Sequence, residues 1–80
     1  MTIGVAVKER ILELCRENDM TINRLSYISG ITQSTLNNVV SGRNNSTTVS
    51  TIQKICDGLE ITIKDFFNAD MFDNIEPELK

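Results

Sequence analysis

Residues 21–42, which read TINRLSYISGITQSTLNNVVSG, decide how this 80-residue chain folds. Thr21 can cap a helix, because its hydroxyl can accept a hydrogen bond from a free amide of the first turn. Three apolar side chains then share one stripe of a helix over residues 22–29, namely Ile22, Leu25 and Ile28. Gly30 permits the positive φ that ends such a helix and turns the chain.

A second helix is predicted over residues 33–41, with Thr32 as its N-cap and Gly42 just beyond its end. Its buried stripe consists of Leu36, Val39 and Val40. Its other face carries short amides and hydroxyls, which are Gln33, Ser34, Asn37, Asn38 and Ser41. Such side chains can pair with base edges in the major groove, so this face suits the reading of DNA.

This arrangement resembles the helix-turn-helix of the Cro/CI repressor family, also called Xre-type regulators. The family pattern is matched by the small Ser26, by Gly30 four residues later, and by the apolar Ile31, Leu36 and Val39. Two flanking segments, VKERILEL and TIQKICDGLEITIKDFF, resemble the first helix and the last two helices of the family. The resemblance covers about residues 5–67 and implies an all-α fold, a compact five-helix bundle with a central helix-turn-helix. Its helices are expected at about residues 5–18, 22–29, 33–41, 49–59 and 63–67.

The expected domain covers residues 1–67, with residues 1–4 as a loose lead-in. Residues 68–80 form an acidic C-terminal tail, for which two alternatives are open. The tail is frayed, or its apolar side chains pack on the first helix or on a second subunit. Those side chains are Met71, Phe72 and Ile75. Leu12, which lies off the apolar stripe of the first helix, is either an ordinary exposed leucine or part of the same contact.

Charge is distributed unevenly along the chain, which has 11 acidic and 8 basic residues and a net charge of −3. Residues 20–56 contain Arg24, Arg43 and Lys54 but no Asp or Glu, and we call this segment the acid-free region. Seven of the acidic residues follow it in residues 57–80. Because carboxylates would repel phosphates, their absence around residues 21–42 supports DNA binding independently of the resemblance.

The composition argues against several other classes of protein. No apolar run approaches the ~20 residues that span a bilayer, and no basic segment followed by a long apolar stretch marks a signal peptide, so a cytoplasmic location is expected. The chain has no histidine, and Cys15 and Cys56 are 41 positions apart, so we expect two free, buried thiols, with no metal site and no cofactor. No nucleophile beside a base and no phosphate loop is visible, so the chain is not expected to be an enzyme.

By the resemblance, base contacts fall on Gln33, Ser34 and Asn38, followed by Thr35 and Asn37. Phosphate contacts are expected at Ile22, Thr32, Ser41, Arg43, Asn44, Asn45 and Thr48. Gln and Asn pair bidentately with adenine, which favours half-sites that contain A·T pairs. Of the phosphate-contacting residues only Arg43 carries a full charge, so a single copy would bind weakly and a dimer on an inverted repeat is expected.

Two functions are therefore compatible with the sequence. The first is a sequence-specific transcriptional regulator, a repressor, that inserts the helix over residues 33–41 into the major groove of double-stranded DNA. The second is a protein-interaction module of the same fold, such as an antitoxin or a repressor antagonist, which the acidic balance supports. A second copy or another protein partner would contact Leu12, Met71, Phe72 and Ile75.

Several residues depart from the family pattern. Cys15 and Val40 stand where relatives often carry an arginine and a glutamate that pair, and both partners are replaced together, so we predict that the two are in contact or nearly so. Ser29 occupies a position that is often apolar and is expected to be buried with its hydroxyl bonded back to its helix. Glu60 replaces the usual terminating glycine, which predicts an irregular end to the helix over residues 49–59.

The remaining residues are given ordinary structural roles. The charged residues of the first helix lie mostly outside its apolar stripe and are expected to be solvated; they are Glu9, Arg10, Glu13, Arg16 and Glu17. Gly58 lies inside a predicted helix, where glycine costs up to ~1 kcal/mol relative to alanine. Ile63, Phe66 and Phe67 are expected to complete the core.

Overall fold

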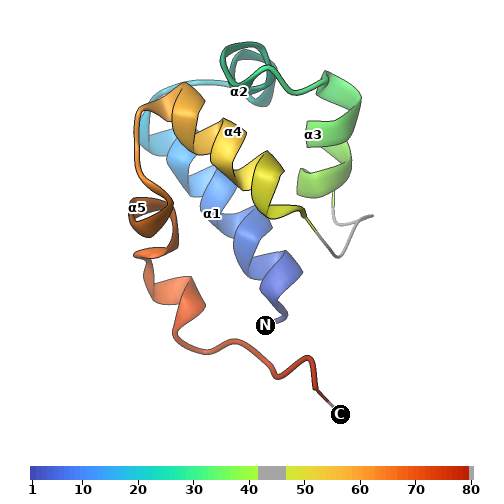
Figure 1. The fold of residues 1–80 in the computed structure, drawn as a ribbon, viewed down its shortest axis with the longest axis vertical. Coiled ribbons are helices and arrows are strands. Elements are labelled where there is room, and N and C mark those ends of the chain that lie inside the picture. Colours follow the sequence, from blue (N-terminus) through green and yellow to red (C-terminus); the bar gives the residue numbers. More distant parts are fainter. Residues whose placement is uncertain (42–46, 80) are drawn as a thin grey trace.

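The computed structural model describes residues 1–41 and 47–79, which contain five α-helices and one short 3-10 helix (Figure 1). The helices are α1 (Ile3–Glu17), α2 (Ile22–Ser29), α3 (Gln33–Val40), α4 (Val49–Leu59), α5 (Ile63–Phe67) and the 3-10 helix η1 (Asp70–Phe72). Strands are absent from the described residues, so the predicted all-α bundle of five helices is confirmed. No helix among these residues is long and apolar enough to cross a membrane.

Each α-helix begins at a threonine. The side chains of Thr2, Thr21, Thr32, Thr48 and Thr62 each accept a hydrogen bond from the backbone amide three residues later, at 3.0–3.2 Å. An amide of the first turn has no partner inside its own helix, so a hydroxyl at this place fixes where the helix starts. The capping threonines explain why the starts of α2, α4 and α5 match the prediction, and the ends of these three helices match it as well.

The start of the chain differs from the prediction. Residues 1–4 were expected to be a loose lead-in, which is wrong, because Thr2 caps α1 and the helix already begins at Ile3. The carbonyl of Met1 also accepts a hydrogen bond from the backbone amide of Glu76 at 3.0 Å. The C-terminal ends of α1 and α3 each lie one residue before the predicted end, at Glu17 and Val40.

The core collects side chains from all five α-helices. It consists of Val7, Ile11, Leu14, Cys15, Leu25, Leu36, Val39, Ile52, Ile55, Cys56 and Phe66. Phe66 belongs to the core as predicted, but the predicted core positions of Ile63 and Phe67 are wrong, because both side chains are exposed. Both cysteines are buried and free, as predicted. Val40 packs, half-buried, against the same cluster that contains Cys15, and direct contact between these two side chains stays a prediction.

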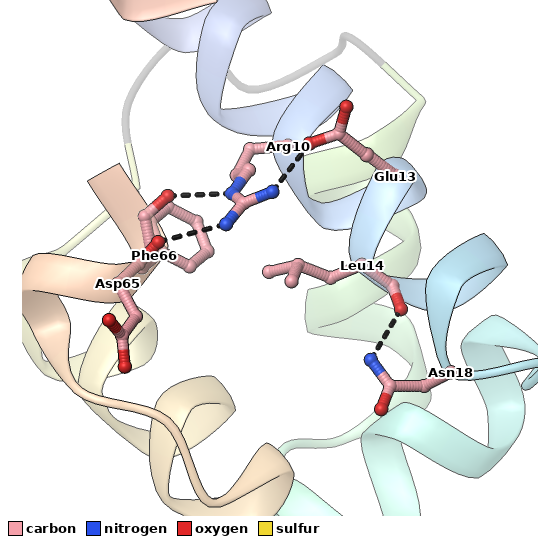
Figure 2. A network of polar contacts seen from close by, with 6 residues as sticks. All are labelled: Arg10, Glu13, Leu14, Asn18, Asp65 and Phe66. Atoms are coloured by element: carbon pink, nitrogen blue, oxygen red, sulfur yellow. Dashed lines mark hydrogen bonds and ion pairs between the residues drawn. The ribbon is translucent and has the colours of Figure 1, made fainter. Parts of the chain in front are cut away.

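Arg10 is buried, so its predicted role as a solvated charge is wrong. Its Nε donates to the carbonyl of Phe66 at 2.7 Å and its Nη2 to the carbonyl of Asp65 at 2.8 Å, while Nη1 pairs with Glu13 (Figure 2). The last carbonyls of a helix lack partners inside the helix, and α5 has only five residues. The guanidinium therefore closes the end of α5 and joins it to α1.

α2 and α4 approach each other closely at Gly58. A Cβ on Gly58 would lie 2.8 Å from Oγ of Ser29 and 3.0 Å from the carbonyl oxygen of Ile28. Ser29 is buried as predicted, but the expected bond from its hydroxyl to its own helix is wrong, because Oγ has no hydrogen-bond partner among the described residues. Packing against α4 occupies the space around this hydroxyl.

The end of α4 is regular although it lacks the usual glycine. Glu60 adopts the left-handed conformation, with φ 60° and ψ 41°. The amide of the next residue, Ile61, donates to the carbonyl of Cys56 at 3.0 Å, which closes the last turn as a glycine would. The predicted irregular end is therefore wrong, and the conformational strain falls on Glu60.

The segment after α5 folds back onto the bundle. η1 lies against α1, and the ring of Phe72 packs 4.9 Å from that of Phe67 and 6.3 Å from that of Phe66, measured between centroids. Phe72 is also packed against the core cluster. In Figure 1 this segment continues below α5, on the side of the bundle away from α2 and α3.

Candidate nucleic-acid interface

α3 lies at the edge of the bundle, across the molecule from α5 (Figure 1). Leu36 and Val39 are buried and attach it to the core, where it packs against α1 and α2. The five residues predicted to contact bases are all exposed, namely Gln33, Ser34, Thr35, Asn37 and Asn38. α3 thus presents a continuous polar surface to solvent, built from hydroxyls and carboxamides alone.

The side chain of Gln33 is held in place by α2. Its Nε2 donates a hydrogen bond to Oδ1 of Asn23. This bond uses one hydrogen of the amide and leaves the other hydrogen and Oε1 of Gln33 available to a ligand. Asn23 was not among the predicted base contacts, all of which lie on α3, although an amide in the first turn of the preceding helix is visible in the sequence.

The two threonines predicted to contact phosphates, Thr32 and Thr48, have the same local geometry. The hydroxyl of Thr32 donates to Oγ1 of Thr35 at 2.8 Å, and the hydroxyl of Thr48 donates to Oγ1 of Thr51 at 3.0 Å. Each capping hydroxyl therefore donates its proton to a hydrogen bond within its own helix. The donors that remain for an anion at these places are backbone amides and the hydroxyl protons of Thr35 and Thr51.

The starts of α2, α3 and α4 have no acidic residue in their first turns. The positive end of each helix dipole is therefore left without a neutralising carboxylate, which favours an external anion. Ile22 is the first residue of α2, where its backbone, not its half-buried side chain, can serve that purpose. α5 differs, because Asp65 completes a capping box with Thr62.

The other predicted phosphate contacts lie around residue 41. Ser41 is exposed and forms the C-cap of α3, and its hydroxyl donates to the carbonyl of Asn38 at 3.2 Å. Arg43, Asn44 and Asn45 lie outside the described residues.

The exposed side of α2 carries two residues to which the prediction gave no role. The guanidinium carbon of Arg24 lies 5.4 Å from the ring centroid of Tyr27, a cation–π distance. The side chain of Tyr27 is 79% exposed, so the ring contributes almost nothing to the core. The sequence offered a signal for this pair, an aromatic residue three positions after an arginine on a helix.

Other chemistries find little support in the described residues. No group of three or more potential metal ligands occurs among them. Burial raises the pKa of Cys15 and of Cys56 above the ordinary value of 9.0. Asp57 and Asp65 raise the pKa of Cys56 further, so both thiols stay protonated near neutral pH and are poor nucleophiles.

A comparison with known families matches residues 10–70 to the Cro/C1-type HTH DNA-binding domain. The chain belongs to this family. The matched residues include α2 and α3, the helix-turn-helix, together with the caps of α2 to α5 and the Asn23–Gln33 bond described above.

The crystal structure of the prophage Lp1 protein 11 resembles this Cro/C1-type domain over nearly its whole length. The two chains share 36% sequence identity and superpose with a TM-score of 0.81, over 94% of this chain and 99% of the other. No curated protein sequence matched the chain.

Proposed function

We propose that this Cro/C1-type domain is a sequence-specific regulator of transcription, a repressor, that inserts α3 into the major groove of double-stranded DNA. The observation that supports this most directly is the exposed polar surface of α3 with Gln33 oriented by Asn23. Eight residues at 1.5 Å each give α3 a length of about 12 Å, close to the width of the groove. The N-terminal end of α3 enters first, as in helix-turn-helix docking.

Gln33 reads adenine in this proposal. Its Oε1 accepts a hydrogen bond from N6 of the base, and the second hydrogen on Nε2 donates to N7. Asn23 keeps Nε2 on the side of α2, so that the amide meets the base in one orientation only. Ser34, Thr35, Asn37 and Asn38 contact neighbouring bases from the same exposed surface.

Phosphate contacts flank this surface. The amides at Ile22, Thr32 and Thr48 and the side chains of Ser41, Arg43, Asn44 and Asn45 hold the sugar-phosphate backbone and fix the register of α3. Most of these donors are uncharged, and affinity through counterion release depends on neutralised phosphates. A dimer on an inverted repeat, with half-sites about 34 Å apart, doubles the number of contacts.

The contact between copies is proposed for the surface that carries Leu12, Met71, Phe72 and Ile75. All four side chains are half-buried in the single chain, so part of each remains accessible. Phe72 packs on Phe66 and Phe67, and these contacts hold the segment in place on the bundle. We place the protein in the cytoplasm, with its DNA, in a non-enzymatic role.

Selection of bound sequences from a pool of random duplex DNA tests this function. We expect enrichment of a short inverted repeat with A·T pairs at the position opposite Gln33, and loss of the preference at that position in Gln33→Ala. Recovery of no preferred sequence, together with stable co-purification of another protein, would instead support the interaction module of the same fold.

A further inference from the structure

The first turn of α2 adjoins the end of α3 that reads bases. The hydrogen bond from Gln33 to Asn23 places these two residues in direct contact. Tyr27 lies one turn after Asn23 on the same side of α2, because residues four apart are neighbours on a helix. Arg24 follows Asn23 in the chain and lies over the Tyr27 ring. These three side chains, Asn23, Arg24 and Tyr27, therefore form one exposed surface that continues from Gln33.

The guanidinium of Arg24 is available to bind an external anion. It forms no ion pair in the part of the chain that the structure describes. Stacking on Tyr27 restricts the guanidinium, so less side-chain freedom is lost when it binds. It also lies in the acid-free region, where no carboxylate of residues 20–56 can compete for it.

We propose that Arg24 and Tyr27 form a clamp for a DNA phosphate next to the base read by Gln33. Arg24 pairs with the phosphate, while the ring of Tyr27 holds the guanidinium and its hydroxyl can donate to the same strand. The inference rests on the proposed function. It adds Arg24 as a second fully charged phosphate contact, beside Arg43. It also gives a reason for a tyrosine that is 79% exposed on a short helix.

The test compares Arg24→Gln with Arg16→Gln. Both variants remove one exposed arginine and change the net charge equally, but Arg16 lies in the last turn of α1. Binding is measured by fluorescence anisotropy between about 50 and 200 mM salt, on a duplex selected with the wild-type chain and on a random-sequence duplex. Thermal unfolding followed by circular dichroism verifies that both variants are folded.

We expect Arg24→Gln to lower the magnitude of the slope of log K against log salt by about 0.9 per bound copy, because one phosphate is no longer neutralised. We expect Arg16→Gln to leave the slope unchanged. Equal slopes for the two variants would overturn the clamp, and would leave the exposed surface of α2 to a protein partner.

Substitutions of Tyr27 test the second half of the clamp. Tyr27→Phe keeps the ring and should bind with the slope of the wild-type chain, whereas Tyr27→Ala should weaken binding about threefold with Arg24 still contributing its charge. Unchanged affinity in Tyr27→Ala would remove the ring from the proposal.

The two proposals can fail separately. Binding without sequence preference would refute the reading of bases by Gln33, yet the slope on random-sequence DNA would still decide the clamp. No binding to either duplex at about 50 mM salt would refute both.

Discussion

Gly58 on α4 faces Ser29 on α2 so closely that the two helices leave no room for a methyl group between them. We predict that Gly58→Ala destabilises the domain by about 1–3 kcal/mol, because the strain of the inserted methyl outweighs the higher helix propensity of alanine. Urea denaturation followed by circular dichroism measures the change. Gln53→Ala, at an exposed position of the same helix, should stay within about 0.5 kcal/mol of the wild-type chain.

The same contact makes a double-variant test available. Ser29→Ala removes a buried hydroxyl that has no partner among the described residues, so it should be neutral or slightly stabilising. In the Ser29→Ala background, Gly58→Ala should cost less than it does alone, since the nearest clashing atom is gone. Additive effects of the two substitutions would contradict the proposed clash.

Replacement of Arg10 should be among the most damaging changes to a charged residue. Arg10→Met leaves the buried carbonyl of Phe66 and the partly buried carbonyl of Asp65 without their donors, and we predict a loss of about 2–4 kcal/mol in the free energy of unfolding. Arg16→Met, which alters an exposed arginine of the same helix, should change stability by less than about 0.5 kcal/mol.

Arg10→Lys distinguishes charge from geometry at this site. Lysine keeps the positive charge but lacks the planar fork that reaches two carbonyls at once, so we expect an intermediate loss. Full stability in Arg10→Lys would show that the charge next to Glu13 is sufficient.

Glu60 offers a stabilising substitution. Its left-handed backbone, with φ 60°, is strained for a residue with a side chain, and Glu60→Gly should raise the free energy of unfolding by about 0.5–1 kcal/mol. Glu60→Ala removes the same carboxylate without relieving the backbone, so it should give no such gain. A similar gain from both variants would mean that the charge, not the backbone, was at fault.

The bond between Asn23 and Gln33 predicts coupled effects on DNA binding. Asn23→Ala should weaken binding by about 1 kcal/mol, because the amide of Gln33 is no longer held in one orientation. Gln33→Ala should weaken binding by about 1–3 kcal/mol, because it removes the amide that reads the base. In the Gln33→Ala background, Asn23→Ala should have little further effect. Equal losses in both backgrounds, measured on the selected duplex, would assign Asn23 a contact of its own.

The parts of the structure that follow from local rules could be predicted from the sequence. Threonine caps set the starts of the helices, and periodic apolar residues identified Leu36 and Val39 as the buried side of α3. The exposure of Gln33 and Asn38 followed from the same periodicity.

What escaped prediction depends on contacts between segments distant in the chain. Arg10 is separated from Phe66 by 56 positions, and no local pattern indicates that its guanidinium meets the end of another helix. The sequence predicted only that Gly58 costs helix stability. Its favourable role, which is to let α2 approach α4 closely, depends on a contact with a distant segment. The roles of Asn23 and Tyr27 depend on side-chain contacts with Gln33 and Arg24, which the apolar periodicity of α2 does not indicate.

The position of Arg10 has a consequence for the order of folding. A helix of five residues, such as α5, does not persist by itself in water, and its last carbonyls depend on a side chain more than fifty positions earlier. We therefore predict that α5 forms late, after α1 has docked, through a contact of high sequence separation. Amide hydrogen exchange at Phe66 and Phe67 would accordingly report the docking of the first helix rather than the strength of the fifth.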